Sequence, residues 1–139
     1  MVVNRHVIRE EAFQILFAKQ SNPDATLADI YDSLPNHPNK IPAYLQTLVK
    51  GVSEHQEELD SQVSQLLASG WEINRLAQTD LVILRLALYE IQFINEVPTV
   101  VAINEALELA KSYSNDKSRK FINGALGKFE RQLEAKENK

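Results

Sequence analysis

The stretch Asp80-Leu-Val-Ile-Leu-Arg-Leu-Ala-Leu-Tyr-Glu-Ile-Gln-Phe-Ile94 decides the fold class. After Asp80, only Arg85, Glu90 and Gln92 interrupt an apolar run, so a helix drawn through it is apolar on nearly every side. Such a helix in a soluble protein is surrounded by other helices. It is also too short and too polar to span a membrane. The stretch therefore predicts the central helix of an all-α fold.

The flanking residues set the expected ends of this helix. Thr79 is a suitable N-cap, and Asp80 is favourable near the positive end of the helix dipole. Pro98 lies just past the far end and cannot continue a helix. We therefore expect the central helix to cover about 80–94.

The composition favours one helical domain over residues 1–139, because 44% hydrophobic residues can build a core at this length. The absence of cysteine excludes disulfides, thiolate metal sites and thiol catalysis, and it fits a reducing compartment. Charged residues, among them Arg5, Arg9 and Glu10, break up the N-terminal segment, so no signal peptide is indicated. We expect a cytoplasmic protein without a membrane span.

Apolar residues recur at helical spacing through the rest of the chain. The other expected helices cover about 4–19, 26–34, 43–69, 99–113 and 117–135, with a short helical link over 71–76. Asn4 and Asp116 are the expected N-caps of the first and last of these, and Gly70 is the expected stop after 43–69. Gly51 lowers the stability of its helix by up to about 1 kcal/mol relative to Ala, which indicates close approach of another helix there. The Pro-rich loop 35–42 is expected to be mobile, and 134–139 to fray.

Charge is distributed unevenly along the chain. Residues 21–110 carry four basic and thirteen acidic residues, whereas 111–139 carry eight basic and four acidic residues. An acidic body with basic ends argues against a general polyanion binder but permits a local nucleic-acid site. The alternative is that the basic C-terminal helix is only a solvated surface.

No constellation of catalytic residues stands out. His6, His37 and His55 do not have metal-ligand spacing on a helix, and no Ser lies in a nucleophile-elbow motif. Neighbouring acids such as Glu57 and Glu58 point in different directions from a helix. We therefore expect a binding protein with no catalytic residues, no metal and no organic cofactor.

Arg85 and the cations near the N-terminus leave two interpretations open. A buried guanidinium without a partner is costly, so Arg85 either forms an ion pair that braces the helices or lines a binding face. Arg5, His6 and Arg9 lie in the first turn and a half of a helix, where cations are mildly unfavourable. They either contact a ligand or form an indifferent surface.

Three ordered segments together resemble the bacterial NusB family of transcription antitermination factors. They are Arg75-Leu-Ala-Gln-Thr-Asp-Leu-Val-Ile-Leu-Arg-Leu-Ala-Leu-Tyr-Glu90, Val97-Pro-Thr-Val-Val-Ala-Ile-Asn-Glu-Ala-Leu-Glu-Leu-Ala-Lys111 and Ser118-Arg-Lys-Phe-Ile-Asn-Gly-Ala-Leu126. The resemblance covers essentially the whole chain, although 21–45 matches only in general character. It implies about seven helices in two packed bundles.

The resemblance also implies a function. Members of the family pair with NusE, a small-subunit ribosomal protein, and bind the single-stranded boxA element of nascent RNA. They act within the RNA polymerase antitermination complex on ribosomal RNA operons, and some form homodimers. The same fold also occurs in ribosomal RNA methyltransferases, so an RNA-binding accessory module of such a system is the alternative. A purely structural interaction module is a third hypothesis.

Carried over by position, the resemblance implies specific contacts. The family's Arg-rich N-terminal stretch falls on 4–9, where it implies RNA binding by Arg5, His6 and Arg9. In the last helix, Lys117, Lys120 and Phe121 match the region implied to lie near RNA. Lys117 stands where some relatives have an acidic residue. Phe121 either stacks on a base or belongs to the core.

Two residues of the central stretch match the surface implied at the junction of NusE and RNA. They are Asp80 and Arg85.

Overall fold

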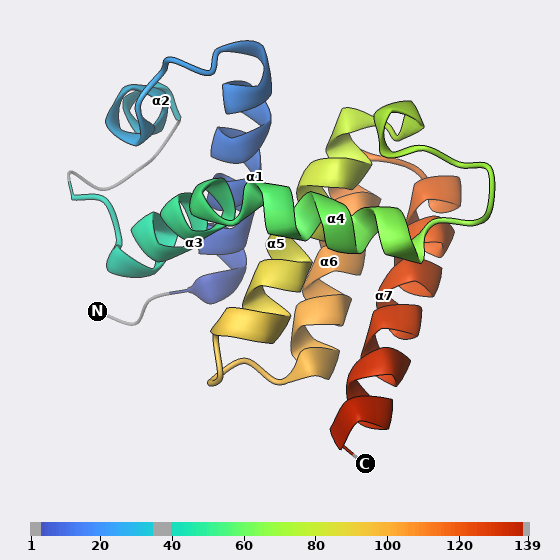
Figure 1. The fold of residues 1–139 in the computed structure, drawn as a ribbon. Coiled ribbons are helices and arrows are strands. Elements are labelled where there is room, and N and C mark those ends of the chain that lie inside the picture. The colour runs from blue at the N-terminus through green and yellow to red at the C-terminus, as the bar shows by residue number, and fades with distance from the viewer. Residues whose placement is uncertain (1–3, 35–39, 138–139) are drawn as a thin grey trace.

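Helices build the described part of the chain, residues 4–34 and 40–137 of a computed structural model (Figure 1). In chain order they are α1 (Arg5–Ser21), α2 (Leu27–Ser33), α3 (Ala43–Glu54), α4 (Gln56–Leu66), the 3₁₀ turn η1 (Ile73–Arg75), α5 (Gln78–Phe93), α6 (Thr99–Tyr113) and α7 (Asp116–Glu137). These ranges contain no strand. The all-α prediction is confirmed.

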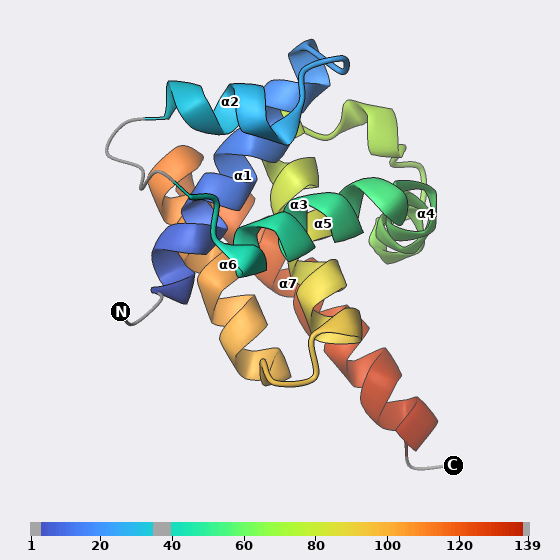
Figure 2. The same ribbon diagram turned by 90° about the vertical axis from the view of Figure 1, so that its left-hand side faces the viewer.

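Helix α5 lies at the centre, as its apolar sequence predicted. Every residue from Asp80 to Glu90 is buried, because α1, α3, α4, α6 and α7 all pack against it. One group of helices, α1 to α3, lies on one side of α5, and the antiparallel pair α6 and α7 lies on the other (Figures 1 and 2). The prediction of two packed bundles is confirmed. One domain over 1–139 stays a prediction.

The predicted N-cap of the central helix is wrong. The Leu81 N–H donates to the Ala77 carbonyl at 3.0 Å, so the helix begins at Gln78 and Thr79 lies inside its first turn. The last helix was also misjudged at its start, because Asn115 rather than Asp116 caps it. The Asn115 side-chain oxygen accepts from the Ser118 N–H at 2.8 Å. At α1 the prediction is confirmed: Asn4 accepts from two backbone N–H groups.

The single helix expected over 43–69 is wrong. The chain bends at His55, which separates α3 from α4, and Figure 2 shows α4 nearly end-on while α3 lies across the view. The bend places the His55 ring on Phe93, with ring centroids 4.4 Å apart. It also directs α4 across α5 and α7. Helical periodicity continues through such a bend, so the sequence pattern alone did not show it.

The ends of two other predicted segments also differ. Helix α4 ends at Leu66, and Gly70 adopts a φ of +88° in the turn beyond it rather than ending the helix directly. Helix α7 continues to Glu137, so 134–137 are helical rather than frayed. Two parts of these predictions lie outside the described residues. They are 35–39, which form most of the Pro-rich loop, and 138–139 at the end of the segment expected to fray.

Gly51 shows the close helix approach that its position predicted. A Cβ built on Gly51 would overlap the ring of Tyr89 on α5. The absence of a side chain therefore lets α3 pack directly against the central helix.

Replacing Gly51 with Ala should lower the free energy of unfolding by about 1–3 kcal/mol, because the new methyl group must displace the Tyr89 ring. Urea denaturation followed by circular dichroism measures the change. Gly124→Ala on α7 is the matched control, since a Cβ there meets nothing within 4 Å. The control should be neutral or stabilise by up to about 1 kcal/mol. Equal effects of the two variants would contradict the packing argument.

Candidate nucleic-acid interface

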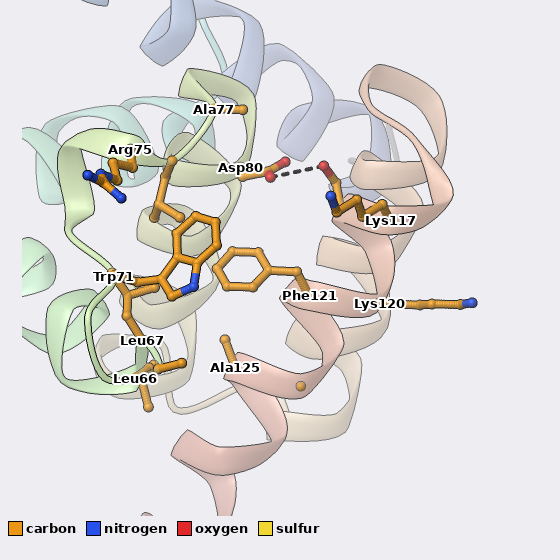
Figure 3. Close-up of a pocket in the computed structure, with 14 residues that line it drawn as sticks. Leu66, Leu67, Trp71, Arg75, Ala77, Asp80, Lys117, Lys120, Phe121 and Ala125 are labelled. Carbon is orange, nitrogen blue, oxygen red and sulfur yellow. Dashed lines mark hydrogen bonds between the residues drawn. The ribbon is translucent and has the colours of Figure 1, made fainter.

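An open cavity lies between the first turns of α7 and the segment from the end of α4 to the start of α5. It has a volume of about 520 Å³ and is open to solvent. Its apolar walls include Leu66, Leu67 and Ala125, and Figure 3 shows these side chains around the opening. A mostly apolar cavity with a few polar groups at its edge has the general form of a ligand site.

Two aromatic side chains line this cavity. Phe121 reaches it from α7 and is partly buried, whereas Trp71 follows Gly70 and is 58% exposed. Their rings point toward one another across the site (Figure 3). Phe121 also packs against the core, which supports the core interpretation, and it borders the cavity as well, so base stacking by this residue stays a prediction.

Cations from two elements line the same site. Lys117 and Lys120 lie three residues apart on α7, and therefore on one face of the helix, while Arg75 belongs to η1. All three are exposed, and Figure 3 shows Lys120 extending away from the cavity. Exposed cations next to aromatic rings are the chemistry that single-stranded nucleic acid binds, through phosphates and bases respectively.

Asp80 lines the cavity from the start of α5, but its carboxylate is engaged inside the protein. It accepts from the Ser118 hydroxyl at 2.9 Å and from the Ser114 hydroxyl at 3.3 Å, and only 7% of the residue is exposed. These bonds fix the first turn of α7 against the first turn of α5. Asp80 thus positions Lys117 and Phe121.

A second group of basic residues lies at the start of α1. Arg5 forms an ion pair with Glu96 at 3.3 Å and stacks over the Tyr44 ring. His6 lies between two carboxylates, with Nδ1 2.7 Å from Glu105 and Nε2 3.1 Å from Glu10. The hydrogen bond to Glu105, together with the charges of both glutamates, raises the pKa of His6 above its ordinary 6.5.

Arg9 lies behind this surface in a buried cluster. Its Nε donates to both oxygens of Glu90, at 2.8 and 3.0 Å, and only 4% of the residue is exposed. The Tyr44 hydroxyl donates to the same carboxylate at 2.6 Å, and burial and this bond raise the pKa of Tyr44. The cluster therefore ties α1 and α3 to α5, and the Arg9 guanidinium does not face solvent.

Arg85 forms a bidentate ion pair with Asp60 of α4, at 2.6 and 2.9 Å. Only 5% of Arg85 is exposed. Of the two interpretations of this residue, the geometry supports the brace between helices. Arg85 also borders a smaller hollow of about 280 Å³ near the end of α1, so a contact with a partner there stays a prediction.

Comparison with known proteins identifies the scaffold that carries these groups. The family model described as the NusB family matches residues 6–131. The chain belongs to the NusB family. The transcription antitermination protein NusB of Limosilactobacillus reuteri (strain DSM 20016) is 67% identical over 134 residues, covering 96% of this chain and 97% of that protein. The resemblance noted from the sequence is confirmed.

Solved NusB structures share the fold. Thermotoga maritima NusB has a TM-score of 0.81 and 32% identity, covering 92% of this chain and 91% of that one. A NusB chain from a complex of antitermination factors NusB and NusE with double-stranded RNA has a TM-score of 0.77 and 27% identity, with coverage of 88% and 92%.

The tertiary structure gathers only part of the predicted NusB-family site. Lys117, Lys120, Phe121 and Asp80 meet at the cavity, whereas Arg5 and His6 lie apart from them at the start of α1 (Figure 1). Trp71 and Arg75 also line the cavity, but the sequence did not predict them as site residues. Trp71 was assigned only to the helical link over 71–76, and Arg75 only to the first family segment. A large aromatic residue after a glycine and close to an arginine, outside the helical apolar pattern, was the available signal.

Metal-binding groups and membrane-spanning helices were searched for in the described residues. Within 4–34 and 40–137, no group of three or more His, Cys, Asp or Glu side chains is arranged to hold a metal ion. The helices of the same ranges include none that is long and apolar enough to cross a bilayer.

Arg9→Ala should lower the free energy of unfolding by about 3–5 kcal/mol, because it leaves the Glu90 charge buried without its partner. Urea denaturation measures this loss. Arg5→Ala, which breaks an exposed ion pair on the same helix, should change the value by no more than about 0.5 kcal/mol. A small effect of both substitutions would contradict the structural role of Arg9.

His6 should titrate above pH 6.5 in the folded protein, because two carboxylates stabilise its protonated ring. A group whose pKa is raised on folding stabilises the fold fully below its unfolded pKa of about 6.5 and loses that stabilisation as the pH rises through the folded pKa. NMR titration of the His6 ring measures the folded value. Glu105→Gln should bring it back toward 6.5, and no change in this variant would exclude Glu105 as the main cause.

Proposed function

We propose that this protein is a transcription antitermination factor that binds boxA-type RNA together with NusE and supports transcription of ribosomal RNA operons. The observation that carries the proposal is the NusB-family match over 6–131, which covers α1 from His6 onward and α7 as far as Arg131. The antitermination name of the L. reuteri relative, 97% of whose length is covered, favours this function over an accessory module of an RNA methyltransferase.

The exposed residues divide into two kinds of RNA contact. Arg5, His6, Lys117 and Lys120 supply charges for phosphates, and Phe121 supplies an aromatic surface for a base. The pairs of Arg5 with Glu96 and of His6 with Glu105 are exposed or partly exposed, so phosphate can replace the carboxylates at little cost. In this proposal both basic groups contact the same RNA strand.

The buried charges act through position. Arg9 holds α1 against α5 and so supports Arg5 and His6, although it does not itself reach RNA in this conformation. Asp80 and Arg85 hold α7 and α4, which border the proposed junction of NusE and RNA. Their contribution to that junction is the placement of neighbouring residues.

NusE is the proposed protein partner, because one similar solved structure holds NusB and NusE together with RNA. We place the protein in the RNA polymerase antitermination complex, and hence in the cytoplasm, where transcription takes place. It acts by binding rather than by catalysis, in keeping with the names of its relatives. Analytical ultracentrifugation across a concentration range tests the homodimer implied by some family members.

The proposal is tested by fluorescence anisotropy with a labelled boxA-like single strand, a scrambled strand and a duplex, each with and without NusE. The boxA-like single strand should bind most tightly, and NusE should increase its affinity. Equal affinity for the boxA-like and scrambled strands, unaffected by NusE, would contradict the proposal. Preference for the duplex would contradict the single-stranded specificity.

A salt series then locates the phosphate contacts. Arg5→Ala and Lys120→Ala should each lower the log–log salt slope by about 0.7, the value per phosphate contact in single strands. Lys128→Ala is the matched control, because Lys128 is an exposed lysine on the same helix that does not line the cavity. An unchanged slope in Arg5→Ala would move the RNA away from the start of α1.

A further inference from the structure

We propose that the cavity beside α7 is a nucleobase subsite, in which one unstacked base of the bound RNA stacks on the indole of Trp71. The inference rests on the proposed function, because it requires that RNA binds, and it adds a residue and a binding mode. Nothing in the sequence comparison assigns a role to Trp71.

Trp71 has the exposure of a binding residue rather than of a core residue. It is 58% exposed, while its neighbours Ile73 and Leu76 pack against the hydrophobic core. The φ of +88° at Gly70 turns the chain just before Trp71. The turn and the anchored η1 segment thus hold an aromatic ring at the surface, where its face is available to a base.

The size of the cavity suits a single base. Its volume of about 520 Å³ lies within the usual range of small-ligand sites, so one base fits while the sugar and phosphates stay outside. Gly124 leaves one wall open, since a Cβ there would meet no atom within 4 Å. The Asp80 oxygens are already hydrogen-bonded to Ser114 and Ser118, so the apolar walls and aromatic faces dominate what a ligand meets.

The charges around the opening select nucleic acid as the occupant. Arg75, Lys117 and Lys120 are exposed and come from elements on both sides of Trp71. This cationic edge lies in a protein whose net charge is −4, so it is a local departure from the overall charge. Phosphates on either side of an inserted base would meet these cations, whereas an apolar protein segment would gain nothing from them.

The chain contains one tryptophan, so Trp71 itself reports on the site. Tryptophan emission is followed while unlabelled boxA-like RNA is added in the presence of NusE. An identical titration of Trp71→Phe is subtracted, which removes any emission from NusE, and a parallel titration of free tryptophan with the same RNA corrects for absorption by RNA. Stacking of a base on the indole should quench the difference signal, with the same Kd that anisotropy gives for the labelled strand.

Two sets of variants test whether the stacking contributes to affinity. Trp71→Ala should weaken RNA binding by about tenfold or more, and Trp71→Phe should retain most of the affinity because it keeps an aromatic face. Phe93→Ala is the control, since Phe93 is also exposed, at 40%, but does not line the cavity. It should bind RNA like the unmodified protein. Circular dichroism checks that each variant is folded.

An abasic scan of the RNA locates the base without altering the protein. One abasic nucleotide is moved along the strand, and a single position should both abolish the quenching and weaken binding by as much as Trp71→Ala does. At that position, Trp71→Ala should cause no further loss. This arm keeps the test decisive if Trp71→Ala proves unfolded.

The outcomes separate this inference from the proposed function. Specific RNA binding with unchanged Trp71 emission and full affinity in Trp71→Ala would overturn the subsite and leave the proposed function standing. A change in emission on addition of NusE alone, with none on addition of RNA, would identify a protein-docking site and overturn the nucleobase assignment. Absence of RNA binding in every arm would overturn both.

Discussion

The structure depends on one constraint, which is the complete burial of α5. From Asp80 to Glu90 no residue of this helix is exposed, so other helices must cover it on every side. Three of the buried residues are charged, and each must find a partner, because an uncompensated buried charge is costly. Each partner lies on a different neighbouring helix, and the three pairs therefore help to fix the positions of those helices.

These partners connect the core to the candidate RNA surface. Glu90 binds Arg9 and Tyr44, which holds α1 and α3. Asp80 binds Ser118, which holds the first turn of α7. The helix starts fixed in this way carry Arg5 and His6 on α1 and Lys117 and Lys120 on α7. The same central helix thus supplies stability to the fold and places two separate basic groups relative to one another.

The arrangement also explains why Arg5 and Arg9, which the family resemblance assigned the same role, lie in different environments. Arg5 and Arg9 lie one turn apart on α1, yet Arg5 forms an exposed pair with Glu96 and Arg9 is buried on Glu90. Sequence position alone gave them the same role. Their burial separates Arg5, whose ion pair is exposed, from Arg9, whose removal would leave the Glu90 carboxylate buried without its guanidinium partner.

The family segments and helical periodicity were sufficient to predict the all-α class, the central helix, the expected contact at Gly51 and the residues Lys117, Lys120 and Phe121 as neighbours. Such features rest on local spacing, and the sequence records spacing directly. The bend at His55 was not predictable in this way, because stacking on Phe93, 38 residues further along the chain, accompanies it. Helix ends at Thr79 and Asp116 were misjudged for a similar reason, since several residues in each segment could cap a helix.

The sequence by itself determined that α5 must be buried and that its charged residues need partners, since both follow from composition and helical geometry. Only the tertiary structure decided which partners they take, and hence that Arg85 braces α4 and Arg9 is withdrawn from solvent. The cavity lined by Trp71, Arg75 and Phe121 was likewise decided only by the tertiary structure. Its residues come from segments about 50 positions apart, and their meeting depends on how α7 packs against the start of α5.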